Sequence, residues 1–222
     1  MSLIVSNMNE RLVFDNSLNA IREAKIPLQD AVLSQGFLRS EIAASTTKGN
    51  YHIPILENDT QNGAAFNTEK RLKLQDAFAV SSIGVFLAKP SSAIDATFRL
   101  FSYPNATQFP TGAASLQTLY NGDISGAVNN KIIVNQWDVS RHYYVPQTQN
   151  AVGVTAQTVF PIDEFDLATS GFYPVEPNLV HVGSKNLKWD LNLPAAFATL
   201  DANTRIVIIW RGVLVQNSTS VY

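Results

Sequence analysis

The chain has no cysteine among its 222 residues, and only 15% of its residues are charged. Without thiols it can form no disulfide, carry no cysteine nucleophile and build no cysteine-based zinc site. Such a composition fits a reducing cytosol, or a particle assembled there. A typical soluble domain has about 25% charged residues. The surface must therefore be hydrated mainly by uncharged polar side chains, of which Asn, Gln, Ser and Thr supply many.

Clustered positive charge is also missing. The formal net charge is -2, and the closest group of basic residues is "EKRLK" at 69–73. Broad nucleic-acid binding needs many clustered Lys and Arg side chains, so we expect no specific nucleic-acid recognition. The 69–73 cluster is interpreted as a solvated turn or helix end, with a nucleic-acid contact as the less favoured alternative.

Two kinds of membrane signal are absent as well. The N-terminus "MSLIVSNMNERLVFDNS" has no basic region followed by a sustained apolar one, so we expect no signal peptide. No apolar run approaches the ~20 residues that span a bilayer. We therefore predict no transmembrane segment, and the apolar run "IVIIW" near the C-terminus must be hidden by protein.

No catalytic or phosphate-binding motif is visible. The 11 glycines are dispersed, so no nucleotide-binding pattern is present. His52, His142 and His181 fall in predicted strands and lack the spacing that brings two imidazoles to one metal. We interpret them as strand residues with local hydrogen bonds. We expect no enzymatic activity and no organic cofactor, although a fold alone never excludes a site.

One acidic cluster offers a possible metal site. Asp163, Glu164 and Asp166 lie together in "PIDEFD". Three carboxylates so close together can supply the hard oxygen ligands that Ca²⁺ prefers. They fit an exposed charged loop equally well, and we favour that interpretation. The expectation for metals is therefore none, with these three residues as the alternative.

From residue 37 onward the sequence consists mostly of short β-rich segments separated by turn residues. We count roughly ten or eleven strands, the spacing typical of a β-sandwich or barrel. A small-residue break in 77–89 indicates a bend or bulge, and Asn129-Asn130 predicts a hairpin turn. The polar stretch 58–71 is predicted to be an exposed loop. The closing run is predicted to be a core strand between two layers, an interpretation favoured over a contact with another chain, and Gly212 would permit a bend where the strand leaves one partner for another.

The N-terminal segment has a different pattern. Residues 17–35 predict a helix capped by Ser17, interrupted at Pro27 and followed by a second short helix that ends at Gly36. Helices this short are marginal alone, so the apolar face needs a partner surface. We predict that 1–36 is an arm and 37–222 the β-domain. The residues expected at a subunit interface are Leu12, Val13, Phe14, Leu18, Ile21 and Ile26.

Together, the arm "RLVFDNSLNAIREAKIPLQDAVLSQ", the hairpin "LYNGDISGAVNNKIIVNQWDV" and the final "IVIIWRGVLVQN" resemble jelly-roll coat proteins of tailless bacterial viruses (bacteriophages). The resemblance implies an all-β, jelly-roll-like antiparallel β-sandwich with a short helical N-terminal arm. One jelly roll fits the strand count better than two. It further implies a self-assembling capsid subunit of a virion, assembled in the host cytoplasm. Its partners would be copies of itself and other virion proteins.

Two other functions fit the same pattern. One is a carbohydrate-binding, lectin-like β-sandwich or a receptor-binding module of a virion. The segment "WDVSRHYYVP" (137–146) would then offer aromatic faces for stacking on sugars, although alternation points Tyr143 and Tyr144 in opposite directions. The other is an enzyme on a β-scaffold.

Overall fold

The computed structural model describes residues 2–29, 31–62, 65–92, 94–145 and 171–218 of the chain. Strands dominate these residues and helices are peripheral, which confirms the prediction of an all-β fold. The elements in chain order are α1 (Ser2–Glu23), β1 (Val32–Ala43), β2 (Asn50–His52), β3 (Ala77–Ala88), β4 (Leu100–Phe101), α2 (Ala113–Leu116), the 3₁₀ helix η1 (Gln117–Asn121), β5 (Asp123–Val128), β6 (Lys131–Asp138), the 3₁₀ helix η2 (Val139–His142), β7 (Phe172–Val182), β8 (Leu187–Asn192) and β9 (Arg205–Gln216).

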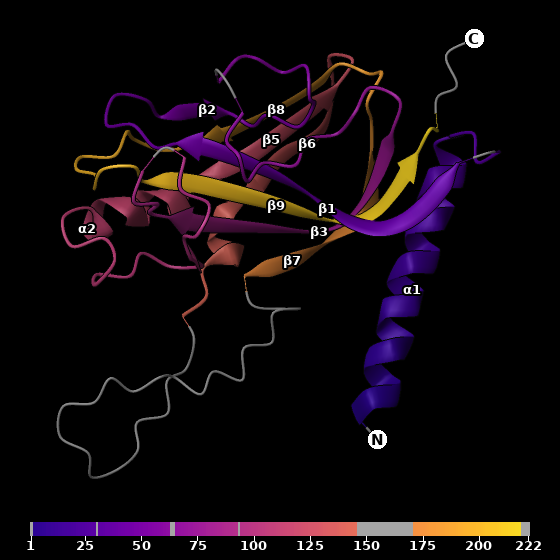
Figure 1. Ribbon diagram of the computed structural model, residues 1–222, viewed down its shortest axis with the longest axis horizontal. Helices are drawn as coiled ribbons and strands as arrows, with labels where there is room; N and C mark the ends of the chain where they lie inside the picture. Colours follow the sequence, from indigo (N-terminus) through magenta and orange to yellow (C-terminus); the bar gives the residue numbers. More distant parts are fainter. Residues whose placement is uncertain (1, 30, 63–64, 93, 146–170, 219–222) are drawn as a thin grey trace.

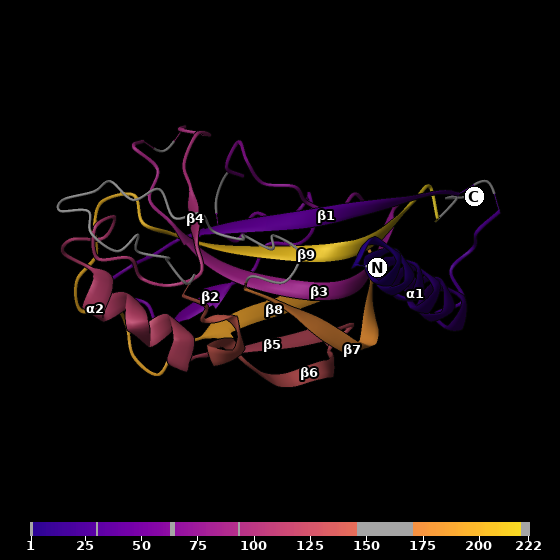
Figure 2. The same ribbon diagram turned by 90° about the horizontal axis from the view of Figure 1, so that it is seen from below.

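The strands form two antiparallel sheets that pack as a sandwich (Figure 2). In one sheet the order is β1-β9-β3-β7, and β4 adds a short pairing with β3 at the end that β7 leaves free. In the other sheet the order is β2-β8-β5-β6. Each sheet takes strands from both the beginning and the end of the chain. This is the arrangement of a jelly roll, in which two Greek keys share one sandwich.

The described residues contain nine strands, fewer than the sequence predicts. One difference lies at 96–103, where the alternating pattern predicts a full strand. Only Leu100 and Phe101 pair with β3 there. In this segment, Phe98 and Leu100 pack against the outer apolar cluster of Phe86, Ala88 and Val207 on the first sheet. Its apolar side chains thus cover a sheet and do not extend one.

Large aromatic rings fill the space between the sheets. Trp189 of β8 and Trp210 of β9 meet there with ring centroids 4.8 Å apart, and neither is exposed. Phe78 and Val80 of β3 point into the same core. Packed sheets lie about 10 Å apart, so side chains of this size fill the gap between them.

Strand β9 is the apolar run near the C-terminus, and it lies between β1 and β3. Ile206 and Ile208 face the inter-sheet core, whereas Val207 faces an outer apolar cluster; all three are fully buried. The prediction of a core strand covered on both faces is confirmed. Burial of this kind stabilises the fold by roughly 25 cal/mol per Å² of apolar surface.

Gly212 has a different role from the predicted one. β9 keeps β1 and β3 as neighbours on both sides of this residue. A Cβ atom at Gly212 would lie 1.8 Å from the carbonyl oxygen of Ala79, because β3 approaches closely where its register shifts between Val80 and Ser82. This shift is the bulge that the small residues of β3 predict. Gly212 is therefore required for close approach of the backbones.

The hairpin of β5 and β6 is confirmed. Its two turn residues, Asn129 and Asn130, have φ values of 49° and 64°. Two successive residues with positive φ make the turn whose twist matches that of the flanking strands, and Asn adopts this conformation more readily than most residues.

The N-terminal segment is one helix instead of two short ones. Helix α1 runs from Ser2 to Glu23 and includes Ser17, so this residue does not cap it. The Ser17 hydroxyl donates instead to the carbonyl oxygen of Val13, one turn earlier, at 2.8 Å. Pro27 follows the end of the helix and therefore does not interrupt it.

The predicted second helix, ending at Gly36, is wrong. Residues from Val32 onward belong to β1, which pairs with β9 over its whole length without a register shift. The division of the chain at residue 36 thus falls inside a strand. Tertiary pairing overrides the weak helical preference of this segment, because the β9 backbone offers partners that an isolated helix turn lacks.

Only the C-terminal part of α1 packs on the sandwich, and the helix then extends away from the sheets (Figure 1). Ile21 is 0% and Ile26 8% exposed. They contact side chains on the face of the β1-β9-β3-β7 sheet that points away from the inter-sheet core. These side chains are Ala77, Ala79, Val182, Val213 and Val215. The arm thus completes the fold of its own chain.

Candidate functional site

Large apolar side chains are exposed on three peripheral elements. Leu12 and Val13 of α1 are 59% and 45% exposed. Val32, Leu33 and Phe37 on β1, and Ile132 and Ile133 on β6, are exposed as well. Single exposed apolar residues are ordinary, but groups of them mark surfaces that contact a partner.

Strand β1 is an edge of its sheet, and only part of that edge is covered. Arg39 exchanges two backbone hydrogen bonds with Lys70 on the side away from β9, at 2.8 and 2.9 Å. The backbone N–H of Glu41 points the same way and donates to the carboxylate of Glu69 at 2.8 Å. Because alternate residues of a strand point their backbone groups to the same side, Leu33, Gln35 and Phe37 also face outward. Within the described residues they have no partner there.

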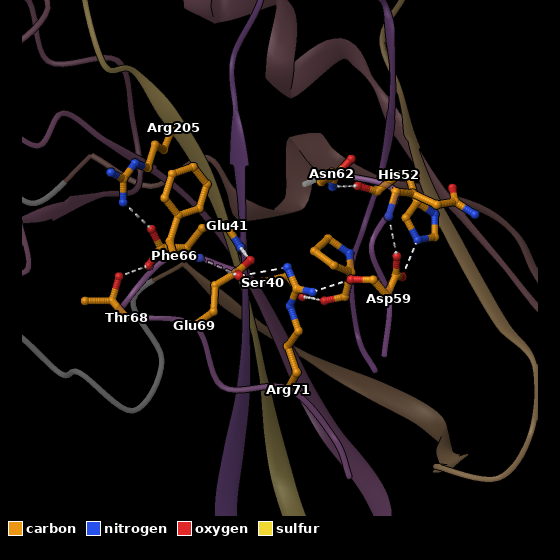
Figure 3. A network of polar contacts seen from close by, with 12 residues as sticks. Ser40, Glu41, His52, Asp59, Asn62, Phe66, Thr68, Glu69, Arg71 and Arg205 are labelled. Carbon is orange, nitrogen blue, oxygen red and sulfur yellow. Dashed lines mark hydrogen bonds and ion pairs between the residues drawn. The ribbon is translucent and has the colours of Figure 1, made fainter. Parts of the chain in front are cut away.

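The covered half of the edge is held by a buried network of charges (Figure 3). The Glu41 side chain, which is 0% exposed, pairs with Arg205 at 2.8 Å and with Arg39 at 2.9 Å. Thr68 donates a further hydrogen bond to it. Arg205 also lies over the ring of Phe66, 3.9 Å from its centroid. The segment that crosses the edge is thus fixed to both β1 and β9.

A second carboxylate ties this segment to the β2 side of the sandwich. Glu69 accepts hydrogen bonds from the backbone N–H of Phe66 and from Arg71, at 2.9 and 2.8 Å. Arg71 donates onward to the carbonyl oxygen of Asp59 at 2.6 Å. Burial raises the pKa of the Glu69 carboxyl above its ordinary value, against the opposing effect of these donors and of Arg71. The paired cations make the buried charges tolerable.

The prediction that 58–71 is an exposed loop is therefore wrong for its last residues. Glu69 is 9% exposed, and the Arg71 side chain is 6% exposed. The same holds for the interpretation of 69–73 as a solvated turn, since Leu72 is buried in the core. This segment satisfies backbone groups of the sheet edge: Lys70 bonds Arg39 through its backbone, and the Glu69 carboxylate accepts from the N–H of Glu41.

The outer face of the other sheet carries a polar hollow of about 600 Å³. Asn192 donates to Asp123 at 3.1 Å and to Ser125 at 3.3 Å, and Lys188 pairs with Asp190 at 3.3 Å. The other lining residues are Asn50, Gly126, Ala127, Ile132, Val134, Asn135 and Gln136. The hollow offers many hydrogen-bonding groups and no aromatic ring.

The three histidines have different surroundings. His52 joins the hollow to the edge network, with Nε2 2.5 Å from Asp59 and Nδ1 3.4 Å from Asp190. His142 lies in η2, not in a strand, and accepts from Trp137 Nε1 at 2.9 Å while Nδ1 lies 3.0 Å from the Gly171 carbonyl oxygen. Burial lowers the pKa of His142 to about 4.

His181 does not fit the prediction of local hydrogen bonds. It is fully buried between Trp189 and Trp210, at 5.3 and 5.4 Å between ring centroids. Neither of its ring nitrogens has a hydrogen-bond partner among the described residues. Burial lowers its pKa to about 3, so the ring is neutral at ordinary pH.

The residues predicted at a subunit interface divide into two groups. Ile21 and Ile26 are buried within their own chain, and Phe14 and Leu18 are half-buried against the same cluster, because the sheet face offers them apolar neighbours. For Ile21 and Ile26 the expected contact with another copy is replaced by this internal contact. Leu12 and Val13 remain exposed.

The remaining predictions concern metal binding and membrane-spanning segments. Asp163, Glu164 and Asp166 lie outside the described residues. In the part of the chain that the structure describes, no three metal-binding side chains gather at one point. Of the helices described, none is long and apolar enough to cross a bilayer.

Comparisons of the chain with protein-family models, with curated proteins and with solved structures found no match. Function is therefore inferred from the fold and surfaces of this chain alone.

Sequence reasoning missed the buried network and the polar hollow. Glu41 and Arg205 are separated by 164 residues in the sequence, so no local pattern links them. One signal was available: Glu41 directly precedes the apolar Ile42 and Ala43 in a β-rich segment, where burial of an unpaired carboxylate is costly. The hollow had no such signal, since its polar residues simply alternate along strands.

Proposed function

We propose that this chain is a structural subunit that assembles with copies of itself into a shell, as the capsid protein of a virion does, and that it has no catalytic role. The observation that carries the proposal is the exposure of large apolar side chains on three separate elements, α1, β1 and β6. Surfaces of this kind gain free energy when a partner removes them from water.

Several separate surfaces favour a shell over a simple dimer. One two-fold contact produces a dimer and stops there. A closed particle needs at least two different contacts on each subunit. The three elements lie on different parts of the molecule: α1 extends from one end, whereas β1 and β6 belong to different sheets (Figures 1 and 2).

The fold is compatible with this function but is also found in proteins with other functions. Jelly rolls occur in viral capsids, in lectins and in other proteins. The absence of cysteine suits a particle assembled in a reducing host cytoplasm. Other virion proteins would be further partners.

Electron microscopy of the purified chain tests the proposal. We expect closed particles or rings of uniform size in wild-type protein. A double variant, Leu12→Ser with Ile132→Ser, should reduce them, because it removes apolar contacts from two surfaces without touching the core. A uniform field of single small molecules at high protein concentration would contradict the proposal.

The polar hollow favours a second candidate, binding of a carbohydrate. Asp123, Asp190 and Asn192 offer acceptors and donors on one face of a sheet. Sugar sites commonly add an aromatic face, and Tyr143 and Tyr144 do not line this hollow. A glycan-binding screen with an Asp190→Ala control distinguishes the two functions, since only this candidate predicts binding that the variant loses.

A further inference from the structure

We infer that the open half of β1, residues 32–38, pairs antiparallel with β1 of a second copy, with Gln35 facing Gln35. The inference rests on the proposed self-assembly and identifies one of its contact surfaces. It joins the β1-β9-β3-β7 sheets of two copies into one continuous sheet.

The open half of β1 lacks the features that protect sheet edges. Proteins commonly protect an edge with proline, charge, a bulge or a short strand. Residues 32–38 read "VLSQGFL", with no proline and no charge, and β1 pairs with β9 without a register shift. An edge of this kind is a template for another strand.

The other edges in the described structure are protected. Strand β7 contains Pro174, Glu176 and Pro177 within its length. Strand β2 has only 3 residues, and β4 has 2. Strand β6 starts at Lys131, ends at Asp138 and has two register shifts against β5. By comparison, β1 is the edge best suited to accept a strand.

The unpaired backbone groups fix how a partner strand must lie. Leu33, Gln35 and Phe37 each direct one N–H and one C=O outward, since these positions are in phase with the hydrogen-bonded Arg39. Residues that exchange both bonds across an antiparallel pair face each other directly. Placing Gln35 opposite Gln35 therefore pairs Leu33 with Phe37 in both directions and satisfies every outward group.

Neighbouring registers are worse because the other half of the edge is occupied. Shifting the pair toward the C-terminus would bring Leu33 of the other copy opposite Arg39, whose backbone groups are already bonded to Lys70. Shifting it the other way leaves Phe37 opposite Ala31, which precedes the strand. The charged network around Glu41 thus determines where the added strand ends.

The side chains also suit a second copy of the same strand. Phe37 is 50% and Leu33 37% exposed. The two-fold axis would place each beside the other across the strands, an apolar cross-strand pair that excludes water. Because the segment has no charge, self-pairing meets no like-charge repulsion, which would penalise a charged strand facing its own copy.

A single cysteine tests the register, because the natural chain has none. In a hydrogen-bonded antiparallel pair, facing Cα atoms lie about 5.5 Å apart, which matches the span of a disulfide. We expect Gln35→Cys to form a covalent dimer under mild oxidation. Lys48→Cys, at an exposed position in the loop between β1 and β2, is the matched control and should remain largely uncrosslinked.

A second variant tests the hydrogen bonds themselves. Gln35→Pro removes an outward N–H that β9 does not use, so circular dichroism should show a folded sandwich. Loss of two bonds per dimer should weaken self-association by about tenfold or more. If Gln35→Pro does not fold, Gln35→Lys, which places two cations face to face, replaces it with the same expected result.

The possible outcomes separate this inference from the proposed function. Crosslinking at residue 35 together with weakened assembly of the variant supports it. Wild-type assemblies that neither crosslink through Gln35→Cys nor respond to either variant would overturn it and leave self-assembly standing. A wild-type chain that stays monomeric at all concentrations would overturn both.

Discussion

At the scale of single residues, the buried histidines should make the protein sensitive to acid. Both have folded-state pKa values below the ordinary value near 6.5: about 4 for His142 and about 3 for His181. The folded state therefore binds fewer protons than the unfolded chain as pH falls below 6.5. Above pH 6.5 the neutral histidines do not lower the free energy of unfolding. As the pH falls from 6.5 toward the folded-state pKa of each histidine, the free energy of unfolding decreases by up to about 1.4 kcal/mol per pH unit.

His181→Leu tests this most cleanly, because His181 makes no hydrogen bond that the change would remove. Urea unfolding at pH 7.5, 6 and 5 should show a shallower loss of stability in the variant than in wild type below pH 6.5. The two profiles should run parallel above pH 7. If the free energy of unfolding fell equally steeply with pH in wild type and variant below pH 6.5, the buried His181 would not be held in its neutral form.

Glu41 gives a second prediction at this scale. Glu41→Gln removes the buried carboxylate that pairs with both Arg205 and Arg39. Removing one partner of a buried ion pair costs about 3–5 kcal/mol, and chemical unfolding should show a loss of this order. Lys188→Gln is the control, because the Lys188 side chain is 67% exposed and its ion pair with Asp190 should contribute little to stability. A Glu41→Gln loss as small as the control's would show that the network does not stabilise the edge.

At the scale of elements, two paired glycines on neighbouring strands should behave differently. Gly36 and Gly212 face each other across β1 and β9. An added Cβ at Gly212 would clash with the Ala79 carbonyl oxygen at 1.8 Å, whereas at Gly36 the nearest atom is 3.6 Å away. Gly212→Ala should therefore lower the free energy of unfolding by about 1–3 kcal/mol or more. Gly36→Ala should leave it nearly unchanged, and equal effects would contradict the account of the bulge.

Helix α1 is expected to have two separable roles along its length. Ile21→Ala should reduce stability by about 2–5 kcal/mol, because Ile21 is fully buried against the sheet. Leu12→Ser should leave the melting temperature nearly unchanged and reduce assembly, since Leu12 is 59% exposed. Thermal unfolding and light scattering on both variants measure the two effects. If Leu12→Ser lowers stability as much as Ile21→Ala, α1 is simply part of the core.

Elements whose conformation is determined by adjacent residues were predicted correctly from the sequence. Elements whose conformation depends on pairing with residues far away in the sequence were not. The Asn129-Asn130 turn and the apolar run of β9 carry their structure in adjacent residues. Residues 28–36 resemble a helix locally, and only pairing with 212–216 of β9 makes the last part of them a strand. The covering of the β1 edge was missed for the same reason, because Glu41 and Glu69 are 28 residues apart.

At the scale of the whole molecule, the sandwich class followed from many short strands, but the sheet order did not. The alternation of apolar and polar residues along a strand shows which side chains face a core. It does not show which strands are neighbours in a sheet. The polar hollow and the open edge depend on that order. Both surfaces therefore became visible only in three dimensions.

Sedimentation velocity across a wide range of protein concentrations measures whether the chain assembles with copies of itself. A structural subunit should move from a 24.3 kDa monomer to one discrete larger species, because closed symmetric assembly has few intermediates. High salt should not disperse that species, since the contacts proposed are apolar and backbone-mediated. A single 24.3 kDa species at every concentration would contradict the proposed self-assembly.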